Sequence, residues 1–451
     1  MTTLIARTFI TPDGTPVAFP YGLTIGTAGT INNIGIPGNP GFGVGIPPSL
    51  PSGFSPTAGT TDPASNTYGN YQYSDGSVMV YIPAFYYKYG TGINGLTVNF
   101  CDVKPFNYYA TVAAANAAGY ALHRAFYNGG AIRPGFFVDK YLCSKNGTIA
   151  SSIKDGVVLT SATRGGLVNT PFSSIGCTNM FYGSIAVAKT RGSMFHVKTI
   201  FQNGALALLS LAHASASTST TYNAWHDAAG VMNFPKGNNN NALGDAQDAT
   251  IAYVWDGNAT YAGCGKTGSA NFPNKVSHNG QGSGVMDING LVWEITPFGL
   301  TADASNFYLL NTSADVNAMT DGNTLATDVW GATGVTSANY TNIGTTNGTT
   351  FSCLTGAGIS RVFGNAAQTL SEVTSGTAWA MAGAGVPLVG GVGGTNQFGN
   401  DYMYDAKPAD MCPFVGGGWN YSSSAGVWAL NCSVDRGGSN VDYGCRVACF
   451  L

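Results

Sequence analysis

Apolar residues along the chain gather in short β-branched and aromatic runs, which predict strands. One run is "GSVMVYIPAFYYKYG" (Gly76–Gly90), in which Pro83 is expected at a bulge or a sheet edge. A second is "GAIRPGFFVDKYLCS" (Gly130–Ser144). The chain closes on "RVACFL" (Arg446–Leu451), which also has the composition of a core strand. A closing strand of this kind predicts that the polar residues just before it are held in the fold.

Two other stretches predict helices. The alanines of "TVAAANAAGYALHRAFYNGG" favour a helix that ends at Gly129 and Gly130. In "FQNGALALLSLAHAS" (Phe201–Ser215), Leu206, Leu208 and Leu209 fall at helical spacing, so this stretch is expected to be a buried core helix. Many short strands with about two helices make an α+β fold the expectation.

The strand-like and helix-like patterns of apolar residues are weaker in three regions. Residues 1–75 are rich in Pro and Gly without periodicity, which predicts an N-terminal arm for anchoring or oligomerisation. Residues 76–451 then form the main domain. Within it, residues 234–250 read as a polar loop, and residues 301–410 read as an insertion of small strands and loops. Plain disorder is the alternative for the arm.

Composition and charge limit the classes of binding partner that we expect. Charged residues make up only 9% of the chain and the net charge is −3, with no basic run, so a nucleic-acid partner is not expected. No stretch has the length of an apolar membrane span, and the N-terminus lacks a signal-like apolar run, so neither membrane insertion nor a secretion signal is expected. The 63 glycines, with abundant Asn, Ser and Thr, favour strands joined by tight turns.

The nine cysteines are widely spread and include no CxxC pair, so we expect buried thiols and neither a disulfide framework nor a zinc site. No GxSxG motif supports a serine hydrolase. Asp287 and Asn289 of "DINGLVWE" could offer oxygen ligands to calcium, but an Asn-Gly turn is the favoured interpretation. No cofactor and no metal are expected.

Three landmarks follow one another along the chain. They are "TRGSMFHVKTIFQNGALALLSLA", then "GSGVMDINGLVWEI" (Gly282–Ile295), then a final segment with "GGGW", "NCSVDR" and "GCRVA". This order resembles the C-type-lectin-like fold of the formylglycine-generating-enzyme superfamily. The openings "MVYIPAFYYKYG" and "RPGFFVDKYLCS" are more similar to one branch of it, the phage and bacterial ligand-binding proteins, which include retroelement-diversified variable proteins such as the phage tropism determinants.

The resemblance implies a test for enzyme activity. The superfamily's oxidases hold copper between two thiolates five residues apart, just after the "GGSW"-like motif. The matching positions here are Val427 and Cys432, so one thiolate is missing and oxidase chemistry is not expected. Iron enzymes of this fold need a histidine set, and the five histidines do not cluster around the final segment in sequence: His123, His196, His213, His226 and His278.

In the diversified relatives the final segment lies across the exposed face of the lectin fold, which implies a set of displayed residues here. Aromatic residues give a binding surface large contact area, and small polar residues give it adaptable hydrogen bonds. The implied receptor-binding residues are Asn420, Tyr421, Ser422, Ser423, Ser424, Val427, Trp428, Asn431, Ser433, Asp435, Ser439, Asn440, Asp442 and Tyr443. Trp419 is either displayed or packed inward, and Arg436 either contacts ligand or pins the loop through backbone carbonyls.

The leading hypothesis is therefore a non-enzymatic virion protein of a tailed phage, in a tail fibre, tail tip or head fibre, that binds a host-surface receptor, either protein or glycan. The arm would contact other virion proteins, and a homotrimer is expected by analogy. The alternative is a decoration protein of the virion whose lectin-like face contacts only other virion proteins. A third and disfavoured hypothesis is an oxidase with an altered metal site.

Overall fold

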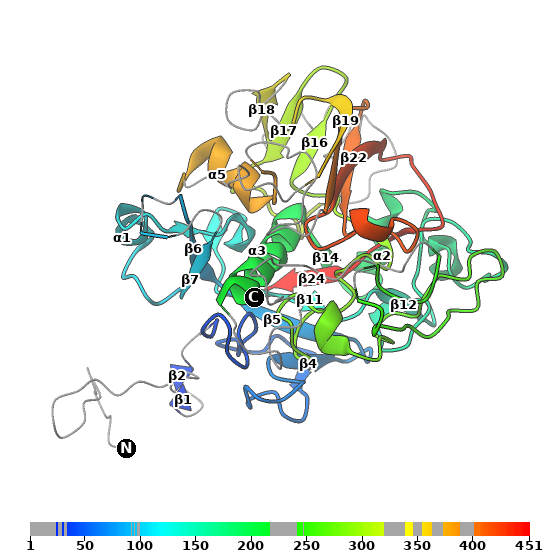
Figure 1. Cartoon of the computed structure of the whole chain (residues 1–451), viewed down its shortest axis with the longest axis horizontal. Helices are drawn as coiled ribbons and strands as arrows, with labels where there is room; N and C mark the ends of the chain where they lie inside the picture. The colour runs from blue at the N-terminus through cyan, green and yellow to red at the C-terminus, as the bar shows by residue number, and fades with distance from the viewer. Residues whose placement is uncertain are drawn as a thin grey trace.

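The computed structural model describes residues 24–25, 29–30, 34–91, 93, 95–96, 100–216, 241–246, 248–319, 339–345, 354–362, 373–387 and 401–451. Within these ranges the chain is β-rich and contains four α-helices (Figure 1). None of the described helices has the length and apolar character needed to cross a membrane. The expected β-rich architecture with few helices is thus found.

One sheet has six strands, and each strand pairs with its neighbours in antiparallel fashion. In spatial order the strands are β14 (His196–Val197), β24 (Val447–Phe450), β11 (Gly135–Asp139), β5 (Val78–Pro83), β4 (Asn70–Tyr73) and β3 (Phe54–Pro56). Phe136 of β11 lies opposite Phe450 on one side and Ile82 on the other. The last strand of the chain is therefore an inner strand, as its composition predicted.

The second sheet has nine strands, which all lie between Trp293 and Gly444 in the chain. Its main path runs through β18 (Tyr340–Gly344), β17 (Phe307–Leu310), β16 (Leu300–Ala302), β21 (Met411–Val415), β22 (Leu430–Asp435), β20 (Tyr402–Ala406) and β19 (Ala357–Val362). Off this path, β15 (Trp293–Ile295) pairs with β21 and with β23 (Tyr443–Gly444). The described strands within residues 301–410 thus pair into the same sheet as the strands that flank them in the chain.

The remaining strands form small sheets. A three-stranded sheet contains β7 (Cys101–Pro105), β6 (Phe85–Tyr89) and β8 (Ala121–Leu122). Two-stranded ribbons are β12 (Cys143–Asn146) with β13 (Ile149–Ser152), β9 (Tyr127–Asn128) with β10 (Ala131–Ile132), and β1 (Thr24–Ile25) with β2 (Gly29–Thr30). The strands predicted within Gly76–Gly90 are therefore β5 and β6, and Pro83 ends the first of them.

The α-helices are α1 (Val112–Ala117), α2 (Gly183–Lys189), α3 (Ile200–Ala216) and α5 (Gly376–Gly383). Four 3-10 turns supplement them: η1 (Arg124–Phe126), η2 (Phe172–Ile175), η3 (Pro273–Val276) and η4 (Ser422–Ser424). Helix α1 is shorter than the sequence predicted. It ends before Gly119, whose φ of 80° is left-handed, and the chain then enters β8 and not a longer helix.

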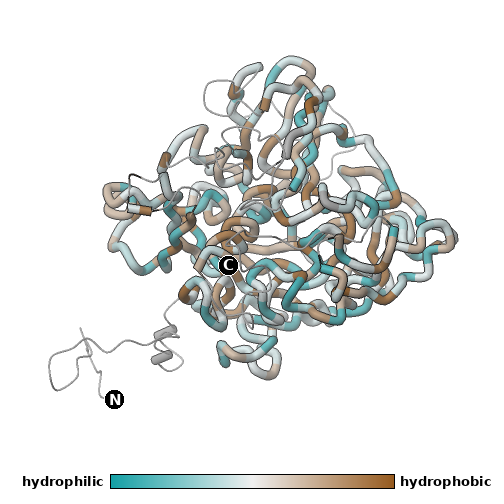
Figure 2. Tube along the Cα trace, in the orientation of Figure 1, coloured by the Kyte–Doolittle hydropathy of each residue, from teal (hydrophilic) through white to brown (hydrophobic). Residues whose placement is uncertain are grey.

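Helix α3 is the buried core helix that the leucine spacing predicted. Its side chains are buried from Ile200 to Ala214, and it contacts β7, η1, α5 and β21. Figure 2 shows strongly apolar stretches of the chain at the centre of the molecule, around this helix. Gly204 brings α3 close to α5, because a Cβ there would lie 2.1 Å from the carbonyl oxygen of Gly383. A larger residue at this position would force the two helices apart.

The six-stranded sheet continues across the domain boundary expected at residues 75 and 76. Strands β3 and β4 precede that boundary, and β4 pairs with β5 beyond it. Tyr71 of β4 is buried and packs edge to face on Phe137, with ring centroids 5.4 Å apart. Residues 54–73 therefore belong to the sheet, although their Pro- and Gly-rich surroundings have no strand periodicity. Residues 1–23, 26–28 and 31–33 of the expected arm lie outside the described ranges.

Candidate binding face

The terminal segment, Gly416–Leu451, alternates between the core and the surface. It leaves β21, turns through η4, returns as β22 beside β21, and then passes through β23 to β24 (Figure 1). Strand β22 is antiparallel to β21 and parallel to β20, so it lies within the large sheet. Two connections, residues 416–429 and 436–442, and the end of β22 are the parts that reach the surface.

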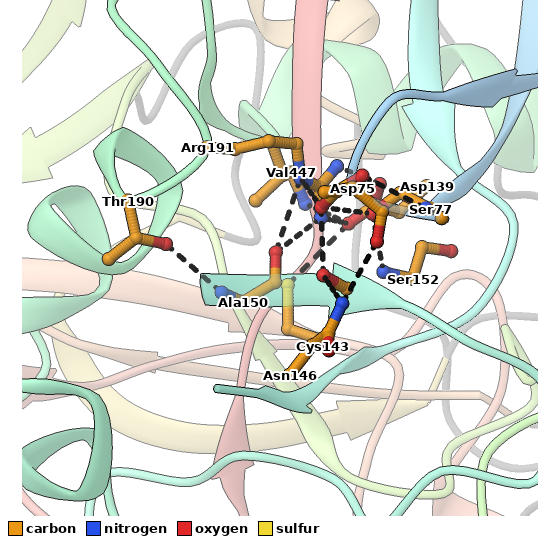
Figure 3. A network of polar contacts seen from close by, with 12 residues as sticks. Asp75, Ser77, Asp139, Cys143, Asn146, Ala150, Ser152, Thr190, Arg191 and Val447 are labelled. Carbon is orange, nitrogen blue, oxygen red and sulfur yellow. Dashed lines mark hydrogen bonds and ion pairs between the residues drawn. The ribbon is translucent and has the colours of Figure 1, made fainter. Parts of the chain in front are cut away.

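Buried charges hold the end of this segment. The backbone N–H of Val447 donates to Oδ2 of Asp139 at 3.0 Å, and Arg191 binds both oxygens of that carboxylate at 2.5 and 3.1 Å. Asp75 lies 3.4 Å from the Arg191 Nε. Figure 3 shows these groups converging beside the start of β24. Burial raises the pKa of Asp139 despite the opposing effect of Arg191, so this contact fixes the strand at an electrostatic cost.

A second anchor joins all three landmark motifs. Arg446 Nε lies 2.9 Å from Oε2 of Glu294, and Lys198 Nζ lies 2.7 Å from the same oxygen. Arg446 also donates to the carbonyls of Lys140 and Met286. Burial raises the pKa of Glu294, but the two cations outweigh it and hold the pKa below its ordinary value. Glu294 is therefore a carboxylate that ties β15 to the end of the segment.

The first connection, residues 416–429, is framed by glycines that permit close backbone approach. Gly417 has φ of +90°, and a Cβ there would lie 2.6 Å from the Cβ of Ala425. Trp419 is packed inward and is 1% exposed, with the Arg164 guanidinium 4.8 Å from the centre of its ring. Of the two alternatives for Trp419, the structure has the inward-packed one. The glycines thus fold this connection back on an aromatic side chain.

Four residues expected on the displayed face are buried in this chain: Val427, Trp428, Asn431 and Asp442. The prediction that these four residues are displayed is wrong, and their local contacts explain why. Trp428 donates its backbone N–H to Oδ2 of Asp401 at 2.7 Å and lies in a small hollow beside α3 and the end of α5. Asn431 accepts a hydrogen bond from the backbone N–H of Ser433 at 2.8 Å, within strand β22. Core packing and strand structure occupy these side chains.

The remaining expected residues reach the surface to different degrees. Exposed residues are Asn420, Ser433, Asp435, Ser439 and Asn440, and half-buried ones are Tyr421, Ser422, Ser424 and Tyr443. The side chain of Ser423 lies outside the described set. These residues come from both connections and from the end of β22. We call the described exposed and half-buried members the terminal face.

Two half-buried tyrosines of this face rest on a buried aromatic pair. Tyr421 meets Trp293 edge to face, with ring centroids 5.0 Å apart, and Tyr443 lies 5.0 Å from Phe414. Trp293 and Phe414 in turn pack edge to face at 4.5 Å. Such geometry fixes the tyrosine rings before any partner arrives, which reduces the entropy lost on binding.

Asp442 lies beneath the same tyrosines. It is 4% exposed, and its Oδ1 has no hydrogen-bond partner among the described residues. Burial raises the pKa of Asp442 to about 6, although Arg164 opposes the shift. The pKa of Tyr443 rises to about 12, first through burial and then through the Asp442 charge. Asp442 is therefore a buried carboxylate and not a displayed one.

The second connection, residues 436–442, is held by residues that sequence reasoning missed. Ser439 Oγ donates to the carbonyl of Ser161 at 2.6 Å, and the Asn440 backbone N–H donates to Ser161 Oγ at 2.9 Å. Arg436 is buried and forms an ion pair with Asp410, Nε to Oδ2 at 2.9 Å. Arg436 therefore pins the loop, one of the two alternatives expected for it, through a carboxylate. Ser161 lies about 280 residues away in the chain, and no local signal identifies it.

The residues considered as metal ligands either lack a ligating group or form hydrogen bonds within the protein. Val427 and Cys432 are both buried, and the first offers no thiolate. Asp287 accepts hydrogen bonds from Thr267 and from the Gly268 backbone, at 2.6 and 2.7 Å. Asn289 is paired with the hydroxyl of Tyr253 at 3.0 Å. Within the described ranges, no three His, Cys, Asp or Glu residues are grouped to hold a metal ion; His226 and Cys353 lie outside those ranges.

This chain is similar to a set of solved structures. No family model matches the sequence, and no curated protein matches it. The structure is similar to the U1, I1 and M1 variants of the Major Tropism Determinant, at 11, 12 and 12% identity and TM-scores of 0.29, 0.29 and 0.26. Each match covers 83% of this chain and 63% of the other, so the chain spans less than two thirds of those proteins.

The similarity to tropism determinants that the motifs indicated is therefore found.

Proposed function

We propose that this chain is a non-enzymatic virion protein of a tailed phage that displays a C-type-lectin-like domain to bind a receptor on the host surface. One observation carries the proposal: a segment whose C-terminal end is fixed by buried charges presents exposed and half-buried Asn, Ser, Asp and Tyr side chains. Their anchors are Glu294 with Arg446 and Asp139 with Val447. A rigid frame with a polar and aromatic exterior is typical of recognition surfaces.

The proposed contact residues are those of the terminal face. Tyr421 and Tyr443 supply contact area on a preformed aromatic base, and Asn420 and Asn440 are exposed groups that can donate and accept hydrogen bonds. Asp435 adds an exposed carboxylate, already oriented by a 2.8 Å hydrogen bond from Gly437. This mixture suits a polar receptor, protein or glycan, and gives catalysis no nucleophile paired with a base.

The lectin-like domain is proposed to comprise residues 76–451, with an insertion at residues 301–410, and β3 and β4 join its sheet from before that boundary. Residues 1–75 are proposed to attach the protein to the virion, on the tail or the capsid, and to sister subunits in a homotrimer. Retroelement-driven variation is proposed for exposed positions of the terminal face. In that arrangement the buried anchors stay constant while the surface changes.

Competition with the intact phage tests the proposal. Purified protein should bind host cells and should slow phage adsorption in proportion to its concentration. Cells of a resistant strain that lacks the receptor should bind neither. If the protein fails to bind cells, and if the terminal face is covered by another virion protein in the assembled particle, the chain is a decoration protein and the proposal is wrong.

A further inference from the structure

A pocket of about 300 Å³ lies away from the terminal segment, between β17, β18, α5 and η1. Its volume is at the lower end of the roughly 300–1,000 Å³ range of ligand pockets. No residue that lines it belongs to Gly416–Leu451. Whatever enters this pocket therefore binds independently of the proposed receptor face.

One wall of the pocket contains a buried cation without an acidic partner. Arg124 is 2% exposed, and it donates to the carbonyls of Tyr127 and Leu310, both at 3.0 Å. Its guanidinium lies 4.4 Å from the ring centre of Phe201. No carboxylate of the described residues lies within ion-pair distance of Arg124. Buried charges are normally paired, so this one is suited to an anion from outside.

The guanidinium has capacity for such an anion. It carries five N–H donors in a planar fork, and the two carbonyl contacts leave others available. Burial lowers the pKa of Arg124 to about 9, so the group is still charged at neutral pH. A carboxylate or phosphate would restore the neutrality that the surroundings do not provide.

A helix N-terminus faces the same pocket. Gly376 and Thr377, the first residues of α5, line it, and the N-cap residue Ser375 makes no capping hydrogen bond with its side chain. Backbone N–H groups in a first helical turn have no partner within the helix, and the helix dipole favours negative charge there. Two independent features, one from η1 and one from α5, thus favour an anion at one place.

The other walls limit the size and character of the ligand. Trp379 is fixed by a 2.8 Å hydrogen bond from its indole N–H to the carbonyl of Leu122, and it offers a flat apolar surface. Thr341 and Asn311 contribute polar groups to the lining, and Ile343 contributes an aliphatic one. Aromatic and polar walls around a small volume fit a single ring that has hydroxyl groups.

We propose that this pocket binds a small organic anion of about one sugar residue in size. Its carboxylate or phosphate would lie against Arg124 and the first turn of α5, and its ring would lie against Trp379. Such a ligand belongs to the chemistry of acidic or phosphorylated glycans. The pocket would then be a second recognition site, apart from the terminal face.

Calorimetric titration of the full chain with glucuronate, glucose 6-phosphate and glucose tests this. We expect at least one of the two anions to bind ten or more times more tightly than glucose, and the better one identifies the acidic group. The advantage should disappear in Arg124→Met, which retains an aliphatic chain beside Phe201. If glucose binds as tightly as both anions, or if neither anion binds, the proposal is overturned.

A second variant protects the test against misfolding of the Arg124 variant. Thr377 is exposed at the mouth of the pocket, so Thr377→Trp should block entry without disturbing the core. Its matched control is Val168→Trp, at a position that is 72% exposed and outside the pocket lining. Anion binding should fall at least tenfold in the first and stay unchanged in the second. Equal binding in both variants would show that the anion sits elsewhere.

Discussion

The Nε of Arg446 lies 2.9 Å from Oε2 of Glu294, in an ion pair whose side chains are 0 and 3% exposed. The two residues are 152 positions apart in the chain, and each belongs to one of the motifs that the sequence singled out. Their contact ties β15 to the end of the terminal segment. Arg446 directly precedes β24, so this buried pair helps to fix the end of the segment that presents the terminal face.

Removing the acidic member of this pair should destabilise the fold strongly. Glu294→Gln leaves Arg446 and Lys198 as buried cations without a carboxylate, and we expect the free energy of unfolding to fall by about 3–5 kcal/mol. Urea denaturation measures this. The matched control is Lys104→Gln, which breaks the partly exposed pair with Asp102 and should cost less than about 1 kcal/mol. Equal losses in the two variants would contradict the anchoring role.

Alanine variants of Trp428 and Tyr421 should differ in the stability that they lose, because only Trp428 is buried in the core. Trp428 is 3% exposed beside α3 and α5, so Trp428→Ala should lower the free energy of unfolding by about 3–5 kcal/mol. Tyr421 is half-buried at the surface, and its replacement by alanine should cost much less. Thermal melting of both variants tests the ranking. If Trp428→Ala melts at the same temperature as wild type, the buried position of Trp428 is contradicted, and its original assignment to the displayed face stands.

Asp442 should make stability depend on pH in one direction. Burial raises its pKa to about 6 in the folded state, against about 3.9 in an unfolded chain. Between these values the folded protein binds more protons than the unfolded one, so this group lowers stability as pH rises from about 4 to 7. Two pKa units correspond to roughly 2–3 kcal/mol.

The variant Asp442→Asn has no charge to bury, so it should be more stable than wild type at pH 7.5 and should gain little at pH 4.5. Urea midpoints across this range give the comparison. A gain that is the same at both pH values would show that the carboxylate is not the cause.

The sequence predicted elements where local pattern decides them. Helix α3 follows from leucine spacing, and β24 follows from its apolar run, because both are buried whatever surrounds them. Helix α1 ended early because Gly119 takes a left-handed φ of 80°, which an alanine-rich pattern does not reveal. Helix α5 was not predicted, since its Gly and Ala residues resemble the loops around it.

The terminal face could be predicted only in part for a similar reason. Glycines and polar residues indicated a displayed segment, and Asn420 and Asp435 are exposed as expected. Burial of Trp428 depends on α3 and on Asp401, and burial of Asp442 depends on how β23 lies beside β15. Such contacts join distant parts of the chain, and residue type alone does not specify them.

The most direct test of the account compares host-cell binding by wild-type protein and by the double variant Asn420→Ala, Tyr421→Ala. The matched control is Val168→Ala with Val254→Ala, two exposed positions outside the terminal segment. We predict that the double variant loses at least tenfold in affinity, that the control binds like wild type, and that all three melt within a few degrees of one another. Unchanged binding by the double variant would contradict a receptor-binding role for the terminal face.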